Sequence, residues 1–326
     1  MKKKSFIFFV FLFVICLLSC KSKDDGTLTV YAYDSFCGSW GAGNEIVKEF
    51  ERETSIKVNL VGCGSAVQMY SRLLLEGRTD ADVMIGFSDS MNVDTSYFYG
   101  WEPECYDNLI EYDEDGLIPF DYGYYSFLLN ENCVSDNIPL CLDDLLKPEF
   151  EKKFILIDPR TSSVGLGLLQ WTVCSMGEER AMQWWKTACR NALTVCDSWS
   201  SAYGLFLEGE APLVISYTTG PVYHILNNDG NSVRALEFSD GHIRTTEYLA
   251  ITESSDKKEE AKRFCEFVLT KAQNRIATVN TMFPANNSTI LPDAFSSALK
   301  PKEIKKEGFS EKQKYYLEKW EETVLK

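Results

Sequence analysis

Apolar and polar positions alternate in blocks along the first part of the chain. Residues 28–33 (LTVYAY), 56–61 and 82–87 are short, mostly apolar runs, and each predicts a strand. Between them, residues 44–52 carry apolar side chains on one helical face. Residues 66–76 follow a serine and precede a glycine, which favour the start and the end of a helix. This alternation of strands and helices is typical of a parallel sheet covered by helices.

The same order of strand, polar turn and helix returns further along the chain. Residues 154–157 (FILI) and 193–196 predict strands, each followed by a polar turn and a helix. Residues 213–226 (LVISYTTGPVYHIL) begin as a buried strand and break into hydroxyls and turn formers. Residues 117–130 predict a long strand that leads into this second unit, and residues 247–251 predict a strand that returns from it.

The pattern therefore predicts an α/β protein of two lobes, each a mixed, mostly parallel sheet flanked by helices, joined by a hinge. Residues 28–119 and 247–326 would form lobe 1, and residues 120–246 would form lobe 2. A ligand would bind between the lobes, where strand ends face each other. Ser310 and Gln313 fit a capping box before a last helix that we expect to pack on the body.

The amino terminus predicts export. Three lysines at residues 2–4 precede an apolar run at 6–18, which is too short to span a membrane. Residues 17–20 (LLSC) resemble the bacterial lipoprotein box, which implies cleavage before Cys20 and acylation of its thiol. Residues 1–20 would then be a lipoprotein signal peptide, residues 21–27 a tether, and the protein would be lipid-anchored in the periplasm or cell envelope. An ordinary signal peptide cut nearby is the alternative.

Charge and cysteine content narrow the function classes. Without residues 1–20 the chain has 30 basic and 48 acidic residues, a net charge of −18. That surface disfavours nucleic acid and anionic membranes and mildly favours cationic ligands, although it also serves solubility. The nine cysteines beyond Cys20 show no zinc-site spacing. They could pack as small apolar residues, or some could form disulfides, for which the candidate pairs are Cys37 with Cys63, Cys133 with Cys141, and Cys189 with Cys196.

Signals for catalysis are weak. The chain has two histidines, His224 and His242, and structural packing is the simpler interpretation of both. The hydrolase and metalloprotease motifs G-x-S-x-G and H-E-x-x-H are absent, and no G-x-G-x-x-G follows the first strand. We therefore expect a protein that is not an enzyme and has no cofactor and no metal.

Binding residues, in contrast, gather at the predicted strand ends. Their aromatic faces could sandwich a flat ring or attract a cation, by about 0.5–2 kcal/mol each. Asp34, Asp121 or Glu247 could hold a positive charge, and Ser65 and the turn at 162–165 could donate to an anion. A cleft of this kind suits an aromatic cation, with or without an anionic tail. Core packing is the alternative for each aromatic residue. The candidates are Tyr33, Asp34, Trp40, Ser65, Ser162, Ser163, Trp199, Tyr217 and Tyr223.

Several motifs carry a family resemblance. They are residues 28–36 (LTVYAYDSF) with Trp40-Gly41, 119–124 (PFDYGY), 158–168 (DPRTSSVGLGL), 199–209 (WSSAYGLFLEG) and 216–226 (SYTTGPVYHIL). Over nearly its full length the chain resembles the thiamine-binding periplasmic proteins of ABC importers. The resemblance implies the two-lobed type II periplasmic-binding-protein fold and a monomeric receptor that captures thiamine or its phosphates and delivers them to a membrane permease. It also implies that Tyr33, Trp199, Tyr217 and Tyr223 line the ligand site and that Ser162 serves the hydroxyl or phosphate end.

Two departures from the family pattern bear on the ligand. The family often has Asp-Gly where this chain has Ser65-Ala66, and many members have tryptophan where this chain has Thr281. Loss of that tryptophan would remove one aromatic wall. The alternative function is ferric-iron binding, through adjacent tyrosines such as Tyr124-Tyr125. An exported enzyme on the same scaffold is a third hypothesis.

Overall fold

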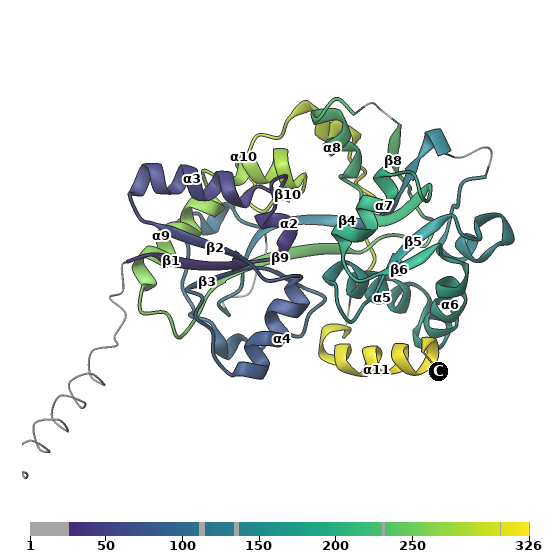
Figure 1. Ribbon diagram of the computed structural model, residues 1–326, viewed down its shortest axis with the longest axis horizontal. Coiled ribbons are helices and arrows are strands. Elements are labelled where there is room, and N and C mark those ends of the chain that lie inside the picture. The colour runs from purple at the N-terminus through teal and green to yellow at the C-terminus, as the bar shows by residue number, and fades with distance from the viewer. Residues whose placement is uncertain (1–25, 111–114, 134–136, 230–231, 307, 326) are drawn as a thin grey trace, which may run out of the picture.

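The computed structural model describes residues 26–110, 115–133, 137–229, 232–306 and 308–325 (Figure 1). The strands are β1 (Leu28–Ala32), β2 (Val58–Gly62), β3 (Val83–Ser88), β4 (Ile118–Asn130), β5 (Phe154–Ile157), β6 (Thr194–Cys196), β7 (Leu213–Tyr217), β8 (Val233–Ala235), β9 (Arg244–Ile251) and β10 (Phe283–Pro284). The helices are α2 (Asp34–Cys37), α3 (Gly43–Thr54), α4 (Ala66–Glu76), α5 (Ser163–Met176), α6 (Glu178–Asn191), α7 (Trp199–Leu207), α8 (Gly220–Leu226), α9 (Lys258–Leu269), α10 (Gln273–Arg275) and α11 (Gln313–Val324).

The strands join in the order β2-β1-β3-β9-β4-β7-β5-β6, with β8 and β10 also paired to β4. β1, β2 and β3 pair in parallel at one end, and β5, β6 and β7 do so at the other. The central pairs are antiparallel, so the sheet is more mixed than the sequence indicated. We call the β1–β3 end with α3, α4 and α9 the first lobe, and the β5–β7 end with α5 to α8 the second lobe.

The strand β4 belongs to both lobes. It pairs with β9 from Ile118 to Tyr124 and with β7 from Tyr125 to Leu129. Figure 1 shows β4 and β9 running side by side from one lobe toward the other. The long strand predicted at 117–130 and the returning strand predicted at 247–251 are therefore confirmed, and β9 begins three residues earlier, at Arg244.

Two large apolar clusters hold the fold, one within the first lobe and one that extends from α4 and β3 into the second lobe. In the first lobe, α3 and α9 cover the sheet and bring Phe50 against Phe264, with ring centroids 5.1 Å apart. In the second lobe, the indole rings of Trp171 on α5 and of Trp184 and Trp185 on α6 are buried in the apolar cluster. These rings are too large to be left exposed without a substantial loss of stability, so they hold both helices on the sheet.

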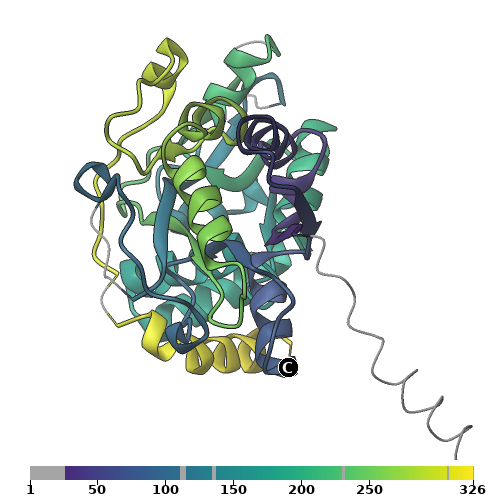
Figure 2. The same ribbon diagram turned by 90° about the vertical axis from the view of Figure 1, so that its left-hand side faces the viewer.

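The last helix packs on the body, as predicted, but its lobe and its start differ from the prediction. α11 packs mainly on α6 of the second lobe, where the rings of Trp320 and Trp185 lie 5.7 Å apart, although residues 247–326 were assigned to lobe 1 (Figures 1 and 2). The predicted capping box is also absent. Ser310 lies in a 3-10 turn, and the side-chain oxygen of Gln313 accepts from the backbone N–H of Asn92 at 2.7 Å. The other lobe boundaries stay predictions.

Some expectations concern residues at the amino terminus. The signal peptide at 1–20, the acylated Cys20 and most of the tether at 21–27 lie outside the described residues. In the described part of the chain, no helix combines the length and the apolar character that a membrane crossing needs. The nine cysteines beyond Cys20 are free thiols, so none of the candidate disulfides is formed in this structure.

Candidate functional site

A cavity of about 530 Å³ lies between the two lobes. This volume is in the range of small-molecule sites. The first lobe contributes the β1–α2 junction, the start of α4 and residues 279–282, and the second contributes the starts of α5, α7 and α8. Asp121, which the sequence offered as a partner for a positive charge, is not in the lining, whereas Glu247 is. The lining also brings together the nine candidates at the predicted strand ends. They are Tyr33, Asp34, Trp40, Ser65, Ser162, Ser163, Trp199, Tyr217 and Tyr223. That these residues bind a ligand stays a prediction.

The second lobe supplies an aromatic wall. Trp199 is the first residue of α7, which Ser198 caps by accepting from the backbone N–H of Ser201. The indole ring stacks on Tyr203 with centroids 4.7 Å apart, and its N–H donates to the hydroxyl of Ser216 at 3.1 Å. These contacts fix the ring before any ligand arrives.

Tyr203 is a lining residue that sequence reasoning did not single out. It lies one helical turn after Trp199, so its ring stands on the same face of α7. Its hydroxyl is 2.9 Å from Nε2 of His224, and its ring meets that of Tyr223 edge-on at 6.5 Å. The i, i+4 spacing within residues 199–209 is the signal that could have identified it.

The histidines have structural positions. His224 is buried behind Tyr203, and burial lowers its pKa while Asp229 acts in the opposite direction. Nε2 of His242 accepts from the backbone N–H of Phe238 at 2.8 Å, so Nδ1 carries the hydrogen and donates to the carbonyl of Tyr125 at 2.8 Å. Burial lowers the pKa of His242 as well. Neither ring lines the cavity.

The first lobe supplies a more open wall. The ring of Tyr33 lies close against Gly86, where a Cβ atom would come within 2.2 Å of it; Gly86 has φ of 110°. The carboxylate of Asp34 accepts from the backbone N–H of Gly64 at 2.9 Å. Trp40 is 46% exposed and lies 5.7 Å from Trp199, so two rings from different lobes meet at the cavity.

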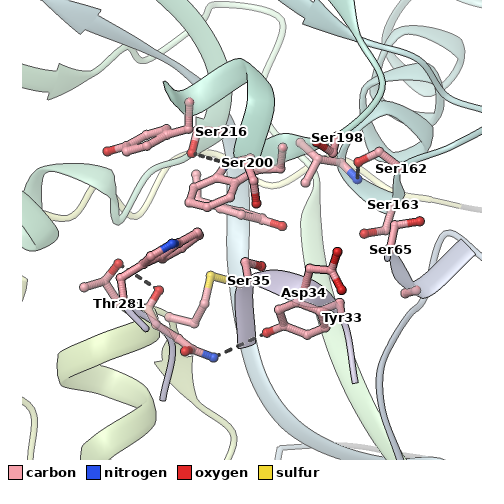
Figure 3. Close-up of a pocket in the computed structure, with 18 of the residues that line it drawn as sticks. Tyr33, Asp34, Ser35, Ser65, Ser162, Ser163, Ser198, Ser200, Ser216 and Thr281 are labelled. Atoms are coloured by element: carbon pink, nitrogen blue, oxygen red, sulfur yellow. Dashed lines mark hydrogen bonds between the residues drawn. The ribbon is translucent and has the colours of Figure 1, made fainter. Parts of the chain in front are cut away.

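Serines gather at one end of the cavity. Figure 3 shows Ser65, Ser162 and Ser163 together there, with Thr281 at the opposite end. Ser65 and Ser162 cap α4 and α5, as the sequence predicted for Ser65. The hydroxyl of Ser65 also donates to the carbonyl of Thr161 at 2.5 Å, which links the two lobes. Its hydrogen is therefore already engaged, whereas the helix starts still carry partial positive charge.

A carboxyl group lines the floor of the cavity and has a second carboxyl group beside it. Glu247 lines the cavity from β9 and pairs in register with Asp121 of β4; they are 8% and 0% exposed. Burial, with a smaller contribution from the charge of Asp89 and against the hydrogen bond with Tyr33, raises the pKa of Glu247 to about 7. Burial, followed by the negative charge of Glu247 as the smaller cause, holds the pKa of Asp121 well above its usual range. Because both pKa values are raised, the pair of Asp121 and Glu247 is fully or partly protonated near neutral pH.

Thr281 stands where the family resemblance leads one to expect tryptophan. It follows a π-helical turn (Ile276–Asn280) and has φ of 53°, a left-handed conformation that β-branched residues rarely adopt. It is 7% exposed, and Met282 lies beside it in the lining. This end of the cavity is lined by small and flexible side chains, without an aromatic ring from residues 279–282.

The adjacent tyrosines do not form a shared metal site. Tyr124 and Tyr125 are consecutive on β4, so their side chains point to opposite faces of the sheet. The hydroxyl of Tyr125 donates within the fold, toward Thr245 at 3.2 Å. Among the described residues, no group of three or more His, Cys, Asp or Glu side chains could hold a metal ion.

Known proteins resemble this chain closely. Residues 94–307 match the family described as bacterial extracellular solute-binding protein. The thiamine-binding periplasmic protein of Escherichia coli (strain K12) is 38% identical over 281 residues, covering 84% of this chain and 85% of that protein. The protein of the same name from Salmonella typhimurium (strain LT2) is 35% identical, covering 96% and 97%. A solved structure described as a periplasmic thiamin binding protein has a TM-score of 0.85 and 36% identity, covering 91% of this chain and 96% of that one.

More distant structures share only the fold. A ferric binding protein from Campylobacter jejuni has a TM-score of 0.72 at 23% identity. The two-lobed α/β prediction is confirmed. Since proteins with 35–38% identity match most of both chains, this protein belongs to the bacterial extracellular solute-binding proteins, in the family of the thiamine-binding periplasmic proteins.

Proposed function

We propose that this protein captures thiamine in the cavity between its lobes and delivers it to the permease of an ABC importer. The observation that carries the proposal is the charge of the lining. It combines four tyrosine and tryptophan rings of the second lobe with the acids Asp34, Asp197 and Glu247, and no lysine, arginine or histidine is among the described lining residues. Thiamine is a flat aromatic cation, which such a lining favours through ring faces and carboxylates.

The end of the cavity that carries Ser65, Ser162 and Ser163 is suited to the hydroxyethyl arm of thiamine. The starts of α4 and α5 can donate to a hydroxyl or a phosphate oxygen there. Asp34 lies at the same end (Figure 3), and Asp197 also lines the cavity, so each added phosphate charge meets negative side chains. We therefore expect thiamine to bind more tightly than its monophosphate, and the monophosphate more tightly than its diphosphate.

Transport requires closure and release rather than chemistry. The ring contact of Trp40 with Trp199 and the hydrogen bond of Ser65 with Thr161 join the lobes around the cavity. A ligand that bridges the two walls stabilises this closed arrangement. In this proposal the protein is a monomeric receptor in the periplasm or cell envelope, anchored by lipid on Cys20, that needs no cofactor and leaves its ligand unchanged.

Isothermal titration of the protein without residues 1–20 tests the proposal. Thiamine should bind with one-to-one stoichiometry, followed in affinity by its mono- and diphosphate. Absence of heat and of any thermal shift with all three compounds would contradict thiamine capture. Equal affinity for the three would contradict the charge argument and leave the capture standing.

The anchor is tested separately in cells. Cys20→Ser should move the protein from the membrane fraction to the soluble fraction of the envelope without changing its affinity for thiamine. An unchanged membrane fraction would show that the anchor does not depend on this thiol.

A further inference from the structure

Two buried carboxyl groups on the central strands have no basic partner among the cavity lining. Asp121 and Glu247 are directly paired across β4 and β9, so their side chains lie on the same face of the sheet. Both oxygens of the Asp121 carboxyl and Oε2 of Glu247 are buried without a hydrogen-bond partner in the described part of the structure. Buried polar atoms are normally paired, and an unpaired carboxylate is costly.

The groups around the pair supply no compensating charge. Tyr33, directly after β1, hydrogen-bonds to Glu247, and Tyr217 from β7 also faces the pair. Asp89, after β3, adds a further negative charge near Glu247 and is itself ion-paired with Lys306 at 2.5 Å. Arg244, on β9, lies over the ring of Tyr122 at 6.0 Å and 3.9 Å from Glu303.

Two neighbouring carboxyl groups in such surroundings cannot both ionise, because each negative charge raises the pKa of the other and burial raises both. Near neutral pH the pair therefore retains a proton. Only Glu247 of the two lines the cavity, so it is the group that a ligand can approach.

We propose that Asp121 and Glu247 form a proton-exchanging cation subsite: the empty protein holds a proton on the pair, and a cationic ligand that enters the cavity drives this proton into solvent. The inference rests on the proposed capture of a cation. It adds which residues hold the positive charge of the ligand and which charge leaves when the ligand enters. One positive charge enters as the ligand and one leaves as H⁺, so the buried site never carries two uncompensated carboxylates. Acid should therefore weaken binding, since more protons must be displaced.

Titration calorimetry with thiamine between about pH 6 and pH 8, in buffers of different ionisation enthalpy, counts the protons. The wild-type protein should release up to about one proton per thiamine, and its affinity should rise by up to about tenfold per pH unit below neutrality. Glu247→Gln should bind more weakly, release no proton and lose the pH dependence. Asp121→Asn, a second variant in case the first does not fold, should reduce the proton release as well.

Glu253→Gln is the matched control, because Glu253 lies just beyond the same strand β9 and is exposed. It should keep the proton release and the pH profile of the wild type. Thiamine binding with no proton release, or an unchanged pH profile in Glu247→Gln, would overturn the inference and leave the proposed function intact.

A measurement on the empty protein separates the two proposals. Infrared spectra near neutral pH should show the C=O stretch of a protonated carboxyl group that Glu247→Gln or Asp121→Asn removes or shifts and Glu253→Gln retains. Absence of that band overturns the inference whatever the ligand. If thiamine fails to bind the wild type, both the proposed function and the release of a proton by thiamine are contradicted, even if the band of the protonated carboxyl group is present.

Discussion

The two walls of the cavity are built in different ways. In the wall of the second lobe, Trp199 is stacked on Tyr203 and hydrogen-bonded to Ser216, so its position is set by the fold. In the wall of the first lobe, Trp40 is 46% exposed and Thr281 sits in a strained left-handed conformation. On the proposed function, this comparison makes the second lobe a preformed platform and the first lobe the part that would cover the ligand and complete the site on closure.

Removal of the platform should have the largest effect. Trp199→Ala deletes the stacked ring and leaves the hydroxyl of Ser216 without its indole donor. We expect thiamine affinity to fall by about 100-fold or more, equivalent to about 3 kcal/mol, because a central, well-packed aromatic residue carries much of the binding energy. Titration calorimetry measures the change.

Trp199→Phe is the control for this variant, since it keeps a smaller aromatic face on Tyr203 while it removes the indole N–H. It should lose much less affinity than Trp199→Ala. If Trp199→Ala binds within about threefold of the wild type, the preformed platform is not the main source of affinity.

The carboxyl floor should make the stability of the empty protein depend on pH. Because the pKa of Glu247 is raised to about 7 in the folded state, the protonated group stabilises the fold below its unfolded pKa. That stability is lost as pH rises from about 4.3 toward neutrality. Glu247→Gln should remove this loss, on the order of 1–3 kcal/mol in free energy of unfolding, measured by denaturant titration across the range.

The histidines act with the opposite sign. The pKa values of His224 and His242 are lowered by burial, so their protonation favours unfolding and stability rises as pH increases toward their unfolded pKa. This contribution is common to the wild type and Glu247→Gln, and the difference between the two curves isolates the carboxyl group. Parallel curves would mean that Glu247 has the same pKa in both states.

The exposed ring of the first lobe should matter less. Trp40→Ala removes a side chain that is 46% exposed and touches Trp199 at one edge of the cavity. We expect about a tenfold loss of thiamine affinity, mostly as faster dissociation, because the ring covers the ligand after it has docked. Stopped-flow fluorescence separates the two rates. A loss as large as that of Trp199→Ala would remove the distinction between the walls.

The sequence could nominate residues that line the cavity because many of them lie at strand ends. In this fold the carboxyl ends of parallel strands point toward one region, so Tyr33, Ser162, Trp199 and Tyr217 could be placed together from local pattern alone. The capping of α4 by Ser65 could also be predicted from the sequence, because a helix cap depends only on neighbours within one turn.

The features that sequence did not settle depend on contacts between distant segments. The sequence offered Asp34, Asp121 and Glu247 as alternatives, and only the β4–β9 register pairs the last two in the floor. The apolar stripe of α11 indicates a buried face but not which lobe covers it, and Trp320 packs on Trp185 of the second lobe. Tertiary contacts of this kind are absent from local periodicity.

The strained residue of the first wall should give the smallest effect. Thr281→Asn places a residue that tolerates left-handed φ at the end of the π-helical turn. We expect the free energy of unfolding to rise by about 0.5–1 kcal/mol, with thiamine affinity changed by less than about threefold. Thr278→Asn makes the same change three residues earlier, inside the turn, and should bring no gain in stability. If Thr281→Asn is destabilising, the left-handed conformation of Thr281 is not a source of strain. If it abolishes binding, Thr281 contacts the ligand directly, and the first wall is as preformed as the second.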